Sequence, residues 1–286
     1  MRDLQPETYT TVLCELEQRT VMPPDETNLL LKSLSAESRE LILSRSKPVH
    51  LPLRTSIYRQ DDPALYAYFL LSGVASIVAT TDDGESVEAI MIGREGLVGS
   101  PELIGPGIAH TQCFVQSEAT ALRIALPDLR KAFRESEEIR NRVLEFLQVQ
   151  VYSLSQIAAC HRLHNAEERL ARWLLMVRDR LHSDMLVLTQ EFLGQMLGSR
   201  RSTVNLVAGT LQRSGLLEYS RGRVRILDNE GLESVACSCY QVIRDINRKL
   251  YSGPSQTAPG GPPSETVQTH GLRPDILSPE FDGRSK

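Results

Sequence analysis

Two different hydrophobic periodicities divide the chain. Across residues 49–126 short apolar runs alternate with turn residues at close spacing, which is typical of a small β-barrel or sandwich. The runs 74–79 and 87–92 flank Asp82-Asp83-Gly84-Glu85. Because glycine tolerates a positive φ, Asp-Gly between two such runs predicts a hairpin. A strand pair at 111–115 and 119–124 is expected to close this β domain.

Ahead of the β region, the apolar residues are spaced as they are on helices. Val12, Leu13 and Leu16 predict a short helix within residues 1–20, ahead of a break at Pro23-Pro24. Asp25-Glu26-Thr27 is expected to open a second helix, whose apolar residues are Leu29, Leu30, Leu31 and Leu34. A third helical stretch is predicted at 36–44.

A long helix is predicted over residues 127–160. Five apolar residues in it are spaced alternately by three and four, which is typical of a coiled-coil seam: Leu144, Leu147, Val151, Leu154 and Ala158. Ile139, Val143, Phe146 and Val149 form a second apolar face. One face can pack on the β domain, and a twin helix in a homodimer is the simplest partner for the other. The alternative is a fully buried core helix in a monomer.

A helix-turn-helix is predicted between residues 188 and 215. Thr189 can cap a helix whose apolar residues are Phe192, Leu193, Met196 and Leu197. Gly198 is expected to end this helix in the left-handed region. A second helix is expected over 201–213, closed by Gly215. Two short helices joined by a tight glycine-containing turn are typical of proteins that place the second helix in the major groove of DNA.

Helical geometry sorts the residues of this second helix. Val204, Val207, Ala208 and Leu211 share one stripe and are expected to be core. The candidates for base readout lie at its N-terminal end and on its opposite side: Arg200, Arg201, Ser202, Thr203, Asn205 and Leu206. Arginine is the commonest reader of guanine, and a leucine can touch a thymine methyl group.

A basic hairpin is predicted to follow, over residues 218–227 with its turn at Arg221-Gly222. Arginines on such a wing suit the phosphate backbone of DNA. The candidates for phosphate contacts are Thr189, Gln190, Arg213, Arg221, Arg223 and Arg225. Each piece alone is commonplace, but the order of capped helix, glycine turn, basic helix and arginine-bearing wing is much rarer, and it favours DNA binding.

The stretch Leu193-Gly194-Gln195-Met196-Leu197-Gly198-Ser199-Arg200-Arg201-Ser202-Thr203-Val204 resembles the helix-turn-helix of the Crp–Fnr regulators, relatives of the cyclic-AMP receptor protein. The glycine-rich run 93–99 resembles that family's cyclic-nucleotide-binding jelly roll, and 167–175 its helix behind the DNA-reading unit. The resemblance covers about residues 27–251. It implies an α+β protein with an N-terminal β jelly roll, a long dimerisation helix and a C-terminal winged helix-turn-helix. It also implies a homodimer on a two-fold symmetric operator in double-stranded DNA, with a sensor that reorients the DNA-binding domains.

This chain departs from the family pattern at several positions. Where family members often carry arginine, glutamate and a later arginine on the recognition helix, this sequence has Arg201, Ser202 and Leu206, which predicts a different operator. Thr111 stands where the resemblance puts the arginine that binds the cyclic-AMP phosphate, and neither Glu95 nor Glu102 falls at the ribose position. We therefore expect no tight cyclic-nucleotide binding.

Charge and cysteine usage refine this interpretation. The net charge is −4, but residues 160–251 hold 14 basic and 10 acidic residues, against 18 and 26 in the remainder. Such an asymmetry is typical of a DNA-facing domain attached to an acidic partner domain. Five irregularly spaced cysteines indicate a reduced, cytoplasmic protein. With no apolar segment at the N-terminus and no long apolar run, we expect neither a signal peptide nor a membrane span.

No catalytic constellation and no cofactor are predicted. Only Cys14 lies near the N-terminus, where an iron–sulfur sensor of this family needs a cluster of cysteines. Cys160, His161 and His164 could hold a metal or a haem, but a plain helix end is favoured. Cys237 and Cys239 are two ligands, too few to close a zinc site alone, so no metal site is predicted. The role of these cysteines stays open.

We therefore predict an N-terminal extension (1–24), a sensor domain (25–133), a dimerisation helix (134–164), a winged helix-turn-helix domain (165–251) and a disordered tail (252–286). The predicted function is sequence-specific regulation of transcription, with RNA polymerase and an unidentified small-molecule effector as further candidate partners. The alternative is a second-messenger-binding protein whose C-terminal domain contacts proteins.

Overall fold

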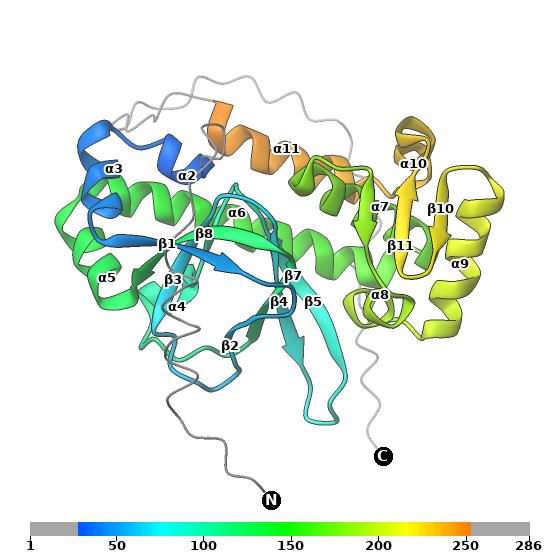
Figure 1. The fold of residues 1–286 in the computed structure, drawn as a ribbon, viewed down its shortest axis with the longest axis horizontal. Coiled ribbons are helices and arrows are strands. Elements are labelled where there is room, and N and C mark those ends of the chain that lie inside the picture. Colours follow the sequence, from blue (N-terminus) through cyan, green and yellow to red (C-terminus); the bar gives the residue numbers. More distant parts are fainter. Residues whose placement is uncertain (1–27, 253–286) are drawn as a thin grey trace, which may run out of the picture. The chain divides into compact units, whose positions relative to one another are not determined.

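A computed structural model describes residues 28–252 of the chain (Figure 1). The predicted helix within residues 1–20, the helix start at Asp25-Glu26-Thr27 and the predicted tail after Ser252 lie outside the described residues. The first described helix, α2 (Leu29–Lys32), is capped by Asn28, whose side chain accepts a hydrogen bond from the Leu31 amide. The predicted stretch 36–44 is α3 (Ala36–Leu43), capped by Ser35.

Two four-stranded antiparallel sheets form the β domain. One sheet has the order β1 (Ser46–Leu51), β8 (Ala119–Ala125), β3 (Tyr66–Leu70), β6 (Leu97–Val98), and the other β2 (Ser56–Tyr58), β7 (Gln112–Ser117), β4 (Val74–Thr80), β5 (Ser86–Ile92). The predicted β4–β5 hairpin is confirmed, with Thr80 opposite Ser86 and a positive φ of 85° at Gly84. The two sheets and their helices make the α+β jelly roll that the resemblance implied.

The predicted closing strand pair is wrong. Both strands exist, but β7 pairs with β2 and β4, whereas β8 pairs with β1 and β3 in the other sheet. Glu118 is the single residue between them. Because the tightest common hairpins need two loop residues, one residue cannot fold β8 back onto β7, and it carries the chain to the other sheet instead.

The prediction of a single helix over 127–160 is also wrong in one respect, because the structure has two helices there. α5 (Leu126–Glu135) ends at Ser136, which has an extended backbone and caps α6 (Glu137–Leu163) by accepting a hydrogen bond from the Ile139 amide at 3.2 Å. A short helix, α4 (Ser100–Ile104), lies between β6 and β7. The second apolar face of α6 is buried as predicted, since Ile139, Val143 and Phe146 join the core of the β domain.

The C-terminal part consists of helices around a small antiparallel sheet. Its elements are α7 (Ala166–Leu181), β9 (Met185–Val187), α8 (Gln190–Leu197), α9 (Arg201–Arg213), β10 (Leu217–Ser220), β11 (Arg223–Ile226), α10 (Asn229–Val235) and α11 (Cys239–Ser252). The sheet order is β10-β11-β9, and sequence reasoning did not predict β9. In Figure 1 helix α11 runs back beside α6, and the two helices pack together.

The hydrophobic core has two large clusters, one inside the β sandwich and one around Trp173 of α7. Val74, Val78 and Met91 from β4 and β5 belong to the second cluster. The C-terminal part therefore shares its core with one face of the sheet that contains β4 and β5. No helix within residues 28–252 combines the length and apolarity needed to span a membrane.

Candidate DNA-binding surface and its link to the sensor

Helices α8 and α9 form the predicted helix-turn-helix. Thr189 caps α8 by accepting a hydrogen bond from the Phe192 amide at 3.2 Å, and Gly198 ends the helix with φ of 55°. Gly194 permits the close approach of the turn, because a Cβ there would lie 2.9 Å from the Ser199 carbonyl oxygen. These local requirements explain why glycine stands at both positions.

Helix α9 has the two faces that the sequence predicted. Val204, Ala208 and Leu211 are buried in the core, and Val207 is half-buried against it. On the other side the Leu206 side chain is 68% exposed. Most of this apolar side chain is open to solvent, so it is available to a partner surface.

The N-terminal end of α9 is open to solvent and carries positive charge. Arg200 occupies the N-cap without a side-chain capping bond, and the first turn holds no acidic residue. Arg200, Arg201, Ser202 and Asn205 are exposed, and Thr203 is half-buried. Unpaired amides and the helix dipole attract anions to such an end.

Strands β10 and β11 form the predicted wing. Its two turn residues, Arg221 and Gly222, have φ of 49° and 75°, the pair of positive values that a tight primed hairpin turn needs. Along β11, Arg223 and Arg225 are exposed while Val224 and Ile226 are buried.

The three wing arginines line one side of a surface hollow of about 420 Å³, together with Met185, Glu218 and Ser220. The wing is held against the start of α8, because the Leu188 amide donates to the Gly222 carbonyl at 2.8 Å. The Tyr219 hydroxyl donates to the Leu188 carbonyl at 2.9 Å. Of the other predicted phosphate contacts, Thr189 and Arg213 are exposed and Gln190 is half-buried.

Arg169 supports the helix-turn-helix from α7, a role that sequence reasoning missed. Its guanidinium donates to the Ser199 hydroxyl at 3.0 Å and to the Leu197 carbonyl at 3.3 Å. It also contacts Nδ1 of His161 at 2.9 Å. One side chain therefore joins the end of α6 to the turn before the recognition helix. The run Glu167-Glu168-Arg169 after the capping residue Asn165 was the available signal.

Helix α7 also forms a hydrogen bond to the sheet that contains β4 and β5. The indole Nε1 of Trp173 donates to Oε1 of Glu88 on β5 at 2.7 Å, and the Ser76 hydroxyl on β4 donates to the other carboxylate oxygen at 2.6 Å. Burial raises the pKa of Glu88, although both hydrogen bonds lower it. A second link is the ion pair between Arg180 and Glu95, at 2.7 Å and almost buried.

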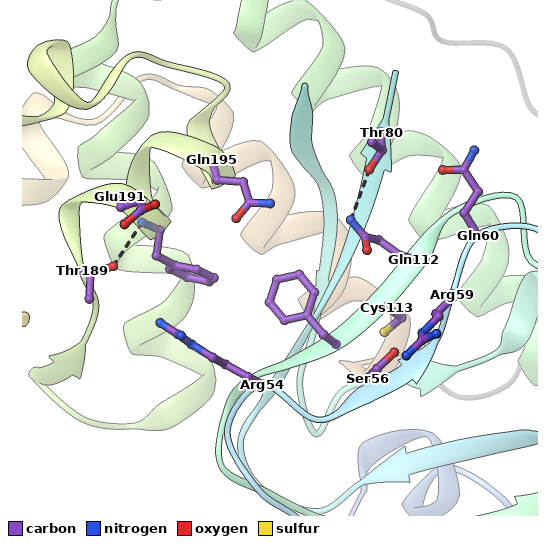
Figure 2. Close-up of a pocket in the computed structure, with 12 residues that line it drawn as sticks. Arg54, Ser56, Arg59, Gln60, Thr80, Gln112, Cys113, Thr189, Glu191 and Gln195 are labelled. Atoms are coloured by element: carbon purple, nitrogen blue, oxygen red, sulfur yellow. Dashed lines mark hydrogen bonds between the residues drawn. The ribbon is translucent and has the colours of Figure 1, made fainter. Parts of the chain in front are cut away.

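A cleft of about 770 Å³ lies between β7 and α8 (Figure 2). Arg54, Arg59 and Gln112 come from the sensor side, and Glu191 and Gln195 from α8. Phe114 and Phe192 meet across it edge to face, with ring centroids 6.1 Å apart. Across this cleft the Phe114–Phe192 pair contacts α8 directly, whereas the two polar links come from α7.

Glu95, in the glycine-rich run, and Glu102, in α4, have different surroundings. Glu95 is neutralised by Arg180, whereas Glu102 is buried and one of its carboxylate oxygens has no hydrogen-bond partner among the described residues. Burial raises the pKa of Glu102. Burial also raises the pKa of the Tyr58 hydroxyl, and the charge of Glu102 raises it further. Thr111, at the position that the resemblance assigns to the phosphate arginine, is half-buried.

The predicted seam lies on the open side of α6. Leu144, Val151 and Leu154 are 43%, 58% and 38% exposed, and Ala158 is exposed as well. Leu147 is half-buried against the core of the β domain. A fully buried core helix is therefore contradicted for the described chain, because α6 presents an apolar stripe to solvent.

Comparison with known proteins agrees with this architecture. Residues 48–136 match the cyclic nucleotide-binding domain family and residues 168–235 the Crp-like helix-turn-helix domain family. Together the two matches cover more than half of the chain.

Among curated relatives, the CRP-like cAMP-activated global transcriptional regulator of Mycobacterium tuberculosis is 23% identical over 193 residues, which are 65% of this chain and 86% of that protein. The transcriptional activator protein FnrA of Stutzerimonas stutzeri is 27% identical over 224 residues, 73% of this chain and 87% of that protein.

Solved structures show the same fold. The c-di-GMP responsive regulator CLP of Xanthomonas campestris superposes with a TM-score of 0.58 at 21% identity, covering 67% of this chain and 99% of that one. A CRP-family transcriptional regulator from Thermus thermophilus gives a TM-score of 0.58 at 23% identity, covering 66% and 97%. The matches do not favour the alternative of a C-terminal protein-contact module. On its two domain matches and its fold, the chain belongs to the Crp–Fnr family of transcription regulators.

Proposed function

We propose that this regulator acts as a homodimer that reads a two-fold symmetric operator, with helix α9 of each copy in the major groove. The sensor is assigned to 25–133, the dimer helix to 134–164 and the DNA-binding domain to 165–251. The observation that carries the proposal is the open N-terminal end of α9, where exposed arginines and free backbone amides lie together. Such an end suits both phosphate and base edges.

Base readout is assigned to Arg200, Arg201, Ser202, Thr203, Asn205 and Leu206. Arginine at the start of the helix suits the O6 and N7 atoms of guanine, and asparagine suits adenine. The exposed Leu206 suits a thymine methyl group. Since Ser202 and Leu206 replace the glutamate and the later arginine common in the family, the half-site should differ from that of typical members.

Phosphate contacts are assigned to Thr189, Gln190, Arg213, Arg221, Arg223 and Arg225. The wing arginines project from a hairpin whose other face is buried, so their direction is set by the fold. Contacts to phosphate fix the register of the protein on DNA without reading its sequence.

Dimerisation is assigned to the exposed stripe of α6, namely Leu144, Leu147, Val151, Leu154 and Ala158. Apolar side chains repeating every three and four residues on a solvent-exposed helix pack efficiently against a copy of themselves. A two-fold axis along this seam requires two half-sites about one helical turn of DNA apart.

The sensor is proposed to lack tight cyclic-nucleotide binding. A buried phosphate needs a compensating cation, and Thr111 supplies none. The buried Glu102 carboxylate, with an oxygen that lacks a partner, would add repulsion. Calorimetric titration of the purified protein with cyclic AMP tests this, and a dissociation constant in the micromolar range or below would contradict it.

The DNA-binding proposal is tested by fluorescence anisotropy with labelled duplexes over a series of salt concentrations. Each neutralised phosphate should contribute about −0.9 to the slope of log K against log salt. A steep negative slope is expected from the wing and the start of α9. Weak binding that does not respond to salt would contradict the proposal.

A further inference from the structure

Four metal-binding side chains meet where the end of α6 touches the start of α11. They are Cys160, His164, Cys237 and Cys239, and one ligand atom from each lies within 4.8 Å of all the others. Cys160 and Cys239 are 0% exposed and Cys237 is 5% exposed. From this geometry we infer a structural site for one zinc ion, held by three thiolates and one imidazole.

The distances suit a mononuclear tetrahedral site. The Sγ atoms of Cys160 and Cys237 are 3.5 Å apart, and Sγ of Cys239 is 3.4 Å from Nδ1 of His164. With zinc–sulfur bonds of about 2.3 Å and zinc–nitrogen bonds of about 2.0 Å, the ligand atoms of a tetrahedron lie about 3.5–3.8 Å from one another. An iron–sulfur cluster needs its ligands spread around several metal atoms, so these closely spaced ligands favour a single ion.

The ligands come from two parts of the chain that the fold brings together. Cys160 and His164 are four residues apart at the end of α6, which places them one above the other on the same face. Cys237 lies two residues before Cys239, which begins α11. Because Cys237 lies 73 positions after His164 in the sequence, each pair alone is incomplete, and only the packing of α11 on α6 completes the set.

The surroundings of the cluster suit thiolates. The amide of Gln156 donates to Sγ of Cys239 at 3.1 Å, and the positive end of α11 begins at that residue. Zinc binding requires the three thiols to release their protons to solvent, after which the centre carries a net charge of −1.

Arg172 is placed to offset that charge. Its side chain is buried at 2% exposure, and its Nε has no hydrogen-bond partner within residues 28–252. Its guanidinium is close enough to interact electrostatically with the Cys160 side chain. The charge of Arg172 also lowers the pKa of Glu88, which burial raises. Arg172 takes part in none of the ion pairs among the described residues. A buried guanidinium without an ion pair is energetically costly unless anionic groups surround it.

The site would fasten the dimer helix to the last helix of the DNA-binding part. At the other end of α11, the Leu250 carbonyl accepts a hydrogen bond from Arg142 of α6 at 3.0 Å. His161, the residue after Cys160, is hydrogen-bonded to Arg169, which holds the turn before α9. Zinc would therefore brace the junction that positions the recognition helix.

The site is tested on the full, untagged chain purified under anaerobic, reducing conditions. Mass spectrometry of the metal content should find about one zinc ion per chain. Cys237→Ser should lose most of this zinc. Cys113→Ser is the matched control, because Cys113 is equally buried but lies in β7 outside the cluster, and it should keep the full content.

Cobalt replacement of the metal in the unmutated protein tests the ligand set without relying on the folding of a variant. Thiolate-to-metal charge-transfer bands together with intense visible bands of a tetrahedral ion are expected. Unmutated protein that holds no zinc, takes up no cobalt in tetrahedral form and leaves its thiols equally reactive with and without added Zn²⁺ would overturn the inference. A Cys160–Cys237 disulfide in reduced preparations, identified by peptide mass, would overturn it as well.

Discussion

Replacing Trp173 by phenylalanine tests the polar link between the DNA-binding part and the sensor. The indole donates to the Glu88 carboxylate at 2.7 Å, and both residues are buried. Phenylalanine keeps an aromatic ring but removes the donor, so Glu88 retains only the Ser76 hydroxyl. A hydrogen bond to a charged group is worth about 1.5–3 kcal/mol, so the free energy of unfolding should fall by about this amount at a pH at which Glu88 is ionised. The smaller ring adds a cavity term.

The loss should depend on pH in a defined direction. Burial raises the folded-state pKa of Glu88 above its usual value, so the ionised carboxylate destabilises the fold above that pKa. As the pH falls through the folded pKa, Glu88 takes up a proton and this destabilisation disappears. Because the Trp173 donor favours the ionised form, its removal raises the pKa further and costs most at high pH. The defect should therefore shrink as the pH is lowered from neutral toward the ordinary pKa of a glutamate.

Urea unfolding followed by circular dichroism measures these free energies, and Glu88→Gln supplies the matched background. Glutamine keeps an oxygen that accepts from the indole but cannot ionise, so the protein with Glu88→Gln should be at least as stable at neutral pH. In the Glu88→Gln background, Trp173→Phe should lower the free energy of unfolding by less, because the hydrogen bond that it removes there has an uncharged acceptor. An equal loss of unfolding free energy in both backgrounds would refute the reasoning, because the cavity alone would then account for the loss.

Three further changes test the surfaces assigned to DNA and to dimerisation. Arg201→Ala should lose about 1–3 kcal/mol of binding to the operator and relax preference at one base position, measured as the affinity ratio between operator and scrambled duplexes; an unchanged ratio would contradict the assignment. Arg223→Ala should weaken binding to all duplexes alike and reduce the salt slope by about 1, and a sequence-dependent loss would assign this residue to base readout instead. Val151→Glu, at a position 58% exposed, should leave the far-ultraviolet spectrum unchanged but yield monomers in sedimentation equilibrium; a stable dimer would place the interface elsewhere.

Features governed by neighbouring residues could be predicted from the sequence. The Thr189 cap, the left-handed Gly198 and the Arg221-Gly222 turn each depend on a few consecutive residues, and the structure has all three. The buried stripe of α9 follows from helical periodicity alone. These local rules were enough for the helix-turn-helix and its wing.

Features that depend on long-range packing could not be predicted. The separation of β7 from β8 depends on which sheet each strand joins, and alternating hydrophobicity carries no such information. Glu88 reads as an ordinary strand residue until Trp173, 85 positions later, is seen to bond to it. The pairs Cys160–His164 and Cys237–Cys239 are each incomplete until α11 folds back on α6.

Selection of bound sequences from a pool of random DNA duplexes by the purified protein, at two salt concentrations, tests the central claim most directly. The account predicts enrichment of a two-fold symmetric site, with half-sites about one helical turn apart and more retained at low salt. Enrichment of a single unrepeated site would contradict the dimer. No enrichment at either salt concentration, alone or with cell extract added to supply an effector, would contradict sequence-specific DNA binding itself.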